Sequence, residues 1–117
     1  MSQGGFSRSH LFYILHSLYG SSPGSTDWGI VGVGLKSWDE KMYSSLKPQD
    51  YLYTVNMLDL NTDSATVVTS LVDYAPLFKD PKEIEKILNP SVKIVSLTVT
   101  EKGYCMVRLE KKRRQRA

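Results

Sequence analysis

Residues 96–104 read Ser-Leu-Thr-Val-Thr-Glu-Lys-Gly-Tyr, and residues 4–10 read Gly-Gly-Phe-Ser-Arg-Ser-His. The first stretch ends an apolar run in a glycine-containing turn, and the second places two glycines before a helical pattern. Between them the chain alternates between strand-like and helix-like segments. Such alternation predicts an α/β fold, in which helices cover a mostly parallel sheet.

The composition is that of one folded domain. With 117 residues, of which 41% are hydrophobic, the chain can bury one modest core. Its single cysteine, Cys105, excludes an internal disulfide and a zinc site made of several cysteines. It suits a reducing compartment, and we expect a cytoplasmic protein. We expect no membrane span and no signal peptide, because no apolar run approaches the roughly 20 residues that cross a bilayer.

The basic charge is concentrated at the C-terminus. Residues 108–117 hold six basic side chains and one acidic one, a net charge of +5, so the other residues contribute −2 to the total of +3. A terminal basic run can bind nucleic acid or anionic lipid. Because no aromatic residues separate these charges, as they do in single-strand binders, we interpret residues 106–117 as a basic, solvated tail. We therefore do not expect a nucleic-acid partner.

The first third of the chain is predicted to hold a helix and a strand. A helical period predicts a helix over residues 7–19 with one apolar face. The apolar residues in this period are Leu11, Ile14, Leu15 and Leu18. Residues 28–35 are apolar on both faces and lie between loops, which is typical of a buried parallel strand.

A second helix is predicted to begin at residue 37. Ser37 would cap it, with Glu40 three residues later completing a capping box. Pro48 would end it. The side chains expected to face inward are Trp38, Met42 and Leu46.

The second half is predicted to hold a hairpin, a helix and a strand. Residues 51–58 alternate and residues 66–72 are rich in β-branched side chains, so we expect them to pair as a β-hairpin. Asp80 followed by Pro81 predicts a helix start. Its inner face would be formed by Ile84, Ile87 and Leu88, and residues 92–99 would form a further apolar strand.

Glycines at a helix start are a candidate phosphate site. Gly4, Gly5 and Phe6 precede the first predicted helix. Glycine lets the backbone approach a pyrophosphate closely, and a helix start presents free N–H groups and partial positive charge. Arg8 could add a charged hydrogen bond to the phosphate. A plain loop is the alternative that spacing alone favours.

An acidic residue follows the predicted strand 28–35. Asp39 could accept hydrogen bonds from the hydroxyls of an adenosine ribose, or it could complement the dipole of its own helix. Lys36 lies nearby and could accommodate a 2′-phosphate, so the choice between NAD and NADP stays open.

Four further residues carry possible chemistry. Glu101 follows the predicted strand 92–99, where parallel sheets place their ligands, and could relay protons or simply cap a turn. His10 and His16 lie six residues apart on the first helix, off a common face, and we expect no metal site. Cys105 has no recognisable basic partner that would make it a nucleophile.

These stretches together resemble the N-terminal domain of the mannitol dehydrogenase family, the polyol-specific long-chain dehydrogenases that include the fructuronate and tagaturonate reductases. Four family patterns occur in order between residues 4 and 105. Gly-x-Gly-Gly-Phe-His-Arg-Ala-His matches residues 4–10, and Trp-x-Ile-x-Gly-Val-Gly-Leu matches residues 28–35. Gln-Asp-x-Leu-Tyr-Thr matches residues 49–54, and Ile-Val-Ser-Leu-Thr-x-Thr-Glu-x-Gly-Tyr matches residues 94–104.

The resemblance implies a partial Rossmann-like, doubly wound sheet with an inserted β-hairpin, and an NAD-dependent oxidoreductase that interconverts a polyol or sugar acid with its keto form. NADP is not excluded. Glu101 would lie near the nicotinamide and the substrate. The family's catalytic lysine belongs to a later part of the family's chain. The residues that the resemblance assigns to the cofactor are Gly4, Gly5, Phe6, Ser7, Arg8 and Asp39.

The sequence also departs from the family pattern. The first glycine of the loop falls on Ser2, the family's histidine is Ser7, and the strand that precedes the loop has no counterpart. We therefore expect residues 1–105 to be a truncated dinucleotide-binding domain that lacks its first strand and is inactive alone, with the polyol bound only by a full-length form. The alternative is a non-catalytic nucleotide-binding or interaction fragment that completes its sheet with a partner chain.

Overall fold

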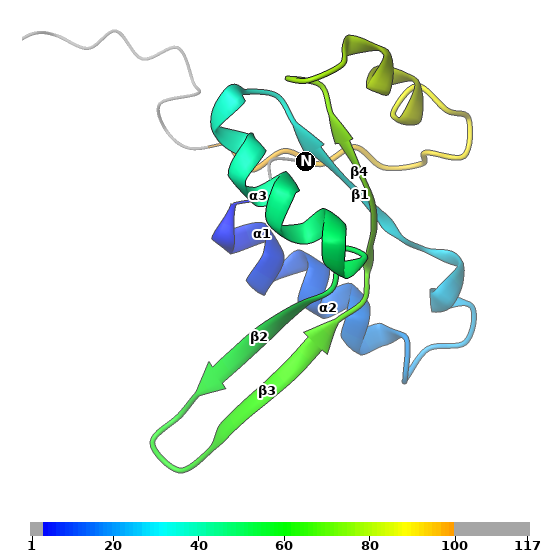
Figure 1. Cartoon of the computed structure of the whole chain (residues 1–117). Coiled ribbons are helices and arrows are strands. Elements are labelled where there is room, and N and C mark those ends of the chain that lie inside the picture. Colours follow the sequence, from blue (N-terminus) through cyan, green and yellow to red (C-terminus); the bar gives the residue numbers. More distant parts are fainter. Residues whose placement is uncertain (1–3, 100–117) are drawn as a thin grey trace, which may run out of the picture.

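The computed structural model describes residues 4–99, and it is an α/β fold. Figure 1 shows the elements in chain order. The helices are α1 (Gly5–Ser9), α2 (Leu11–Leu18) and α3 (Glu40–Leu46), and the strands are β1 (Ile30–Gly34), β2 (Tyr53–Leu58), β3 (Asp63–Val68) and β4 (Leu71–Pro76). Short 3₁₀ helices are η1 (Ser25–Asp27), η2 (Ser37–Asp39), η3 (Lys47–Gln49) and η4 (Pro81–Lys86).

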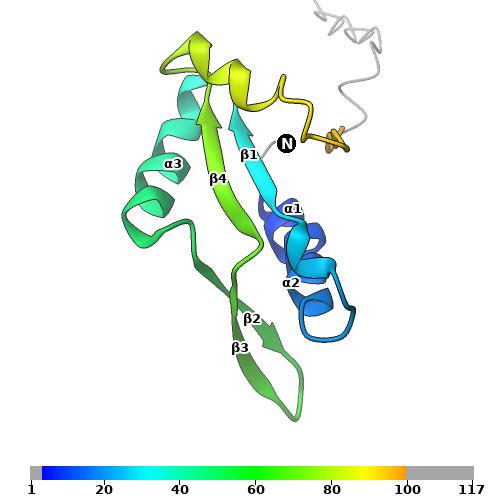
Figure 2. The ribbon, with the colours of Figure 1, turned by 90° about the vertical axis from the view of Figure 1, so that its right-hand side faces the viewer.

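Strands β1 and β4 form a parallel pair that runs from Ile30 beside Leu71 to Gly34 beside Pro76. Helix α3 lies on one side of this pair, and α1 and α2 lie on the other (Figure 2). The chain between the two strands contains both α3 and the hairpin of β2 and β3. A parallel sheet with helices on both faces confirms the predicted fold class. Within residues 4–99 the parallel sheet has these two strands.

The predicted hairpin exists, but its second arm is wrong. Strand β2 pairs antiparallel with β3, which ends at Val68, and the hairpin projects from the body (Figure 1). Residues 71 and 72, assigned to the hairpin from sequence, instead begin β4. The chain turns between the two strands, where the buried Ser70 hydroxyl donates a 2.6 Å hydrogen bond to the Phe12 carbonyl. A side chain that bonds the backbone of another element interrupts the ladder.

The first predicted helix is divided at His10, whose backbone (φ −114°, ψ −83°) leaves the helical region. The Ser9 hydroxyl donates to the Gly5 carbonyl at 2.7 Å, and the His10 ring approaches the Phe6 carbonyl at 3.0 Å. The Phe6 carbonyl also accepts the backbone N–H of His10 at 3.0 Å, so α1 ends in a turn closed by both backbone and side-chain bonds. In α2 the fully buried residue is Phe12, one position away from the predicted apolar face.

The second predicted helix begins later than expected. Residues 37–39 form the 3₁₀ helix η2, and the α-helix α3 starts at Glu40. The tighter winding rotates Trp38 off the inward face, and its side chain is 76% exposed rather than buried. Leu46 is buried and Met42 partly buried, as predicted.

Two predictions for the C-terminal part had different outcomes. Asp80 caps η4, accepting the Lys82 amide at 3.0 Å, and Pro81 opens the helix. The helix is 3₁₀ rather than α, so Ile84 and Leu88 are 43% and 74% exposed and do not form an inner face. Residues 92–99 are not a strand in this structure, because no neighbouring strand among the described residues pairs with them.

The core lies between α2, α3 and the strands. Its buried cluster consists of Phe12, Leu46, Val68 and Leu71. A second buried group at the carboxyl end of the sheet packs Tyr43 against Tyr74, with 5.2 Å between the ring centroids and an angle of 46° between the rings. Both groups are formed by residues far apart in sequence, so the packing ties α2 and α3 to β4.

Candidate functional site

The glycine pair stands at the start of α1 with open space beside it. Gly4 precedes the helix as its cap. A Cβ atom at Gly4 would meet no heavy atom within 4 Å, and one at Gly5 would meet only Arg8 Nη2, at 4.0 Å. A ligand can therefore approach the backbone here, and the first turn of a helix has N–H groups without intrahelical partners.

The next two residues of the predicted site point in different directions. Phe6 is 63% exposed, and its ring stacks on that of His10 with 4.3 Å between centroids. Ser7 is buried, and its hydroxyl shares a 3.0 Å hydrogen bond with the Thr98 hydroxyl. Ser7 thereby joins α1 to residues 92–99, so that the two ends of the described chain lie side by side.

Arg8 carries a buried donor without a partner. Within residues 4–99, no acceptor forms a hydrogen bond with its Nε atom. An unpaired buried donor costs about 1–3 kcal/mol, and more when it is charged. The backbone carbonyl of Arg8 accepts a 2.7 Å hydrogen bond from the Tyr53 hydroxyl, which holds α1 against β2. The backbone of Arg8 is thus held against β2, and its guanidinium lies near Gly5 with a buried Nε donor that has no partner within residues 4–99.

The Tyr53 hydroxyl makes the protein sensitive to alkaline pH. Burial raises the pKa of Tyr53 to about 12, although the nearby Arg8 charge acts in the opposite direction. A folded-state pKa above the unfolded value stabilises the fold below about pH 10, and this stabilisation is lost as the pH rises from about 10 to about 12.

We therefore expect the free energy of unfolding to fall between about pH 10 and about pH 12. In Tyr53→Phe this fall should be smaller, because the ring remains while the ionisable hydroxyl is absent. Urea unfolding of both proteins across this range measures the difference. Parallel curves for the two proteins would contradict the assignment to Tyr53. Part of the dependence should persist in the variant, because burial, aided by the Asp39 charge, also raises the pKa of Tyr74 to about 12.

Asp39 lies just beyond the carboxyl end of β1, as predicted. Its Oδ2 atom accepts the backbone N–H groups of Leu35 at 3.0 Å and Lys36 at 3.1 Å. These bonds fix the carboxylate at the turn that follows β1. Lys36, two residues beyond β1, is exposed.

The remaining candidate residues from the sequence are His16, Glu101 and Cys105, and only the first lies in the described part of the chain. His16 Nδ1 accepts the backbone N–H of Thr69 at 3.2 Å and lies 3.0 Å from its hydroxyl, so it holds α2 to the turn between β3 and β4. Within the described part of the chain no three metal-ligating side chains cluster. Glu101 and Cys105 lie outside the described residues, as do the predicted tail and the end of the predicted domain.

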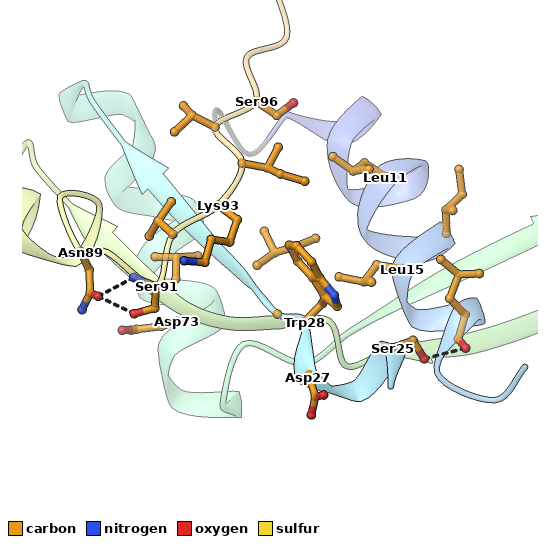
Figure 3. Close-up of a pocket in the computed structure, with 18 of the residues that line it drawn as sticks. Leu11, Leu15, Ser25, Asp27, Trp28, Asp73, Asn89, Ser91, Lys93 and Ser96 are labelled. Carbon is orange, nitrogen blue, oxygen red and sulfur yellow. Dashed lines mark hydrogen bonds between the residues drawn. The ribbon is translucent and has the colours of Figure 1, made fainter. Parts of the chain in front are cut away.

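A groove of about 930 Å³ was not foreseen from sequence. Figure 3 shows Leu11 and Leu15 of α2 on one side, the stretch from Lys93 to Ser96 on the other, and Trp28 between them. The edge of β1 borders the groove through Ile30, Val31 and Val33. One feature of the sequence pointed to this groove, namely the apolar face predicted for the first helix. In the structure, that face lines the groove instead of packing into the core.

No helix among residues 4–99 has the length and hydropathy to cross a membrane. No protein-family model matches the chain. Curated relatives do match it, two mannitol dehydrogenases among them. A mannitol dehydrogenase of Saccharomyces cerevisiae, DSF1, is 43% identical over 102 residues, and a mannitol 2-dehydrogenase of Emericella nidulans is 42% identical over 105 residues. Each match covers 86% of this chain and 20% of the relative.

A solved structure is similar in fold. It is the mannitol 2-dehydrogenase of Pseudomonas fluorescens in a ternary complex with NAD and D-mannitol, with a TM-score of 0.79 and 40% sequence identity. The similarity covers 88% of this chain and 21% of that one, and it confirms the Rossmann-like architecture. This chain is therefore a relative of the mannitol dehydrogenases that spans about a fifth of their length.

Proposed function

We propose that this chain provides the dinucleotide-binding part of an NAD-dependent oxidoreductase that interconverts a polyol or sugar acid with its keto form. The observation that carries the proposal is its similarity, over most of its length, to a structure solved with NAD and D-mannitol. We place the dinucleotide-binding domain at residues 1–105 and a basic tail at residues 106–117. The single cysteine supports a reducing, cytoplasmic location.

The residues present suit a dinucleotide. The open space beside Gly4 and Gly5 leaves room for a pyrophosphate at the start of α1, and the unpartnered Arg8 Nε is a charged donor for it. Phe6 would cover the ligand with its exposed ring. Ser7 would act through its bond to Thr98, which holds the loop in place. The cofactor, when bound, accepts the hydride from the carbinol carbon.

Asp39 would bind the adenosine ribose from the end of β1. Because two backbone amides hold its Oδ2 atom, the carboxylate is pre-positioned, and an ordered acceptor loses little freedom when a ligand binds. A carboxylate repels a 2′-phosphate, which favours NAD, whereas the nearby Lys36 leaves NADP possible. We place Glu101 beside the nicotinamide and the polyol on the resemblance alone.

Arg8 gives the sharpest test of the proposed cofactor site. We expect Arg8→Gln to weaken NAD binding at least tenfold, because it removes a charged hydrogen bond worth roughly 1.5–3 kcal/mol. Isothermal titration calorimetry of NAD into both proteins measures the change. Lys82→Gln is the matched control, since it removes the same charge from an exposed position on η4. Equal weakening by both variants would contradict the role of Arg8.

A second function is supported by one further observation. The outer edge of β1 has no paired strand within residues 4–99 and borders an apolar groove. Unpaired strand edges readily accept another strand. We therefore also propose that this chain completes its sheet with a strand from a partner chain.

A further inference from the structure

The two histidines of this chain make hydrogen bonds of opposite kinds. Nδ1 of His16, on α2, lies 3.2 Å from the backbone nitrogen of Thr69, and Nδ1 of His10 lies 3.0 Å from the backbone carbonyl of Phe6. A backbone N–H can only donate a hydrogen bond and a carbonyl can only accept one. Nδ1 of His16 must therefore be free of a proton, whereas Nδ1 of His10 must carry one.

Protonation consequently affects the two rings differently. A charged imidazole carries a proton on both ring nitrogens, so His10 keeps its bond to the Phe6 carbonyl and His16 loses its bond to the Thr69 amide. The Thr69 hydroxyl lies 3.0 Å from the same nitrogen and can turn to accept from the charged ring. The amide has no such choice, because no backbone carbonyl among residues 4–99 accepts it.

The His16–Thr69 contact lies at the base of the hairpin. Thr69 falls between β3 and β4, and α2 lies beside this base (Figure 1). His16 is half-buried and Thr69 is exposed, so protons reach the contact from solvent. A second bond between the same two parts, from the Ser70 hydroxyl to the Phe12 carbonyl, uses a group that does not titrate near neutral pH. Acid therefore acts on the first bond and leaves the second in place.

The surroundings of His16 contain little that would stabilise a charged ring. In the part of the chain that the structure describes, His16 forms no ion pair, and α2 carries no other charged side chain. The ring of Tyr19 lies 6.2 Å away between centroids, and burial raises the pKa of Tyr19, which keeps it neutral. Strands β3 and β4 hold one acid each, at the far end of the hairpin and in an ion pair with Lys86, namely Asp63 and Asp73.

We propose that the His16–Thr69 contact is a pH-sensitive switch. It is closed while His16 is neutral, and it opens when His16 is protonated, which frees the turn between β3 and β4 from α2. Histidine is the side chain that ordinarily changes charge between pH 5 and 8, so the switch works in mildly acidic solution. The inference is independent of both proposed functions, because it involves neither the nucleotide nor the edge of β1.

Nuclear magnetic resonance of the ring nitrogens tests the closed state. At about pH 8, where histidine is ordinarily neutral, we expect His16 to carry its proton on Nε2 and His10 to carry its proton on Nδ1. The two tautomers give different ¹⁵N shifts, so each histidine is the control for the other. A proton on Nδ1 of His16 at this pH would overturn the inference.

Hydrogen exchange of the Thr69 amide tests the opening. The protection factor, which corrects for the intrinsic effect of pH on exchange, should fall at least about threefold as His16 becomes protonated, because one hydrogen bond of ordinary strength is lost. Circular dichroism should stay unchanged over the same range. In His16→Asn the side-chain oxygen keeps an acceptor near Thr69 that does not titrate, so the fall should disappear. His10→Asn is the matched control and should retain the fall.

Three results would overturn the switch. They are a His16 ring that stays neutral down to about pH 4, well below the ordinary range of histidine, a Thr69 protection factor that is the same on both sides of the His16 titration, and an equal fall in His16→Asn and the unchanged protein. If His16→Asn does not fold, the ring titration and the exchange of the unchanged protein decide the question together.

Discussion

Phe12→Ala is expected to lower the free energy of unfolding by about 3–5 kcal/mol. Phe12 has no exposed surface and lies at the centre of the cluster with Leu46, Val68 and Leu71. Its removal loses the burial of an aromatic side chain and leaves a cavity between α2, α3 and the strands. Urea unfolding followed by circular dichroism measures the change.

The matched control is a second phenylalanine, Phe6 in α1, which lies outside the core. Phe6→Ala removes a ring that is 63% exposed and stacked only on His10 among aromatic side chains of the described chain, so we expect a loss of about 1 kcal/mol or less. If Phe12→Ala leaves no folded protein, Phe12→Leu keeps the cluster filled and should show a smaller loss. Similar losses for Phe6→Ala and Phe12→Ala would refute this core.

Gly34→Ala is expected to destabilise the fold by about 1–3 kcal/mol. A Cβ atom at this position would lie 2.6 Å from the Tyr74 hydroxyl and 2.8 Å from Phe78 Cε1. Tyr74 is buried and packed on Tyr43, so its ring cannot withdraw without disturbing a second aromatic side chain. The gain of about 0.4–1 kcal/mol from a less flexible unfolded chain is too small to compensate.

Gly20→Ala provides the control for the glycine substitution. A Cβ atom at Gly20 would meet nothing within 4 Å, so we expect its stability to change by less than about 0.5 kcal/mol. Gly34→Ala should in addition weaken NAD binding, because it displaces the end of β1 to which Asp39 is bonded through Leu35 and Lys36. If Gly34→Ala and Gly20→Ala had the same free energy of unfolding, the tight packing of Tyr74 and Phe78 against Gly34 would be contradicted.

Local patterns predicted the elements that local contacts stabilise. The apolar run around β1 and the Asp80-Pro81 helix start were both found, because a buried strand and a capped first turn leave clear signals over a few residues. The predicted strand over residues 28–35 also placed Asp39 just beyond the carboxyl end of β1, where the structure has it.

Contacts between distant residues decided the features that the sequence left out. Strand β4 was hidden because Asp73 and Pro76 are poor strand formers, yet Asp73 is stabilised by Lys86 at 3.3 Å, thirteen residues later. The division of the hairpin from β4 depends on Ser70 and its bond to Phe12. The strand predicted over residues 92–99 from their apolar, β-branched composition was wrong, because a strand requires a paired neighbour and none lies beside these residues in the described chain.

In the candidate site, too, some features follow from local sequence patterns and others from contacts between distant residues. Gly4, Gly5 and Arg8 could be named from the sequence, since glycines before a helix and a following arginine are a local pattern. The unpartnered Nε atom of Arg8, the inward turn of Ser7 to Thr98 and the groove beside β1 depend on the packing of segments up to 91 residues apart. No local pattern reports such contacts.

Calorimetric titration of NAD into the folded 117-residue chain tests the central claim most directly. Circular dichroism first establishes that the preparation is folded. The account predicts saturable binding of one NAD per chain, which Arg8→Gln weakens and Lys82→Gln leaves unchanged. A folded chain that shows no binding heat with NAD or NADP would contradict the assignment of this domain to dinucleotide binding.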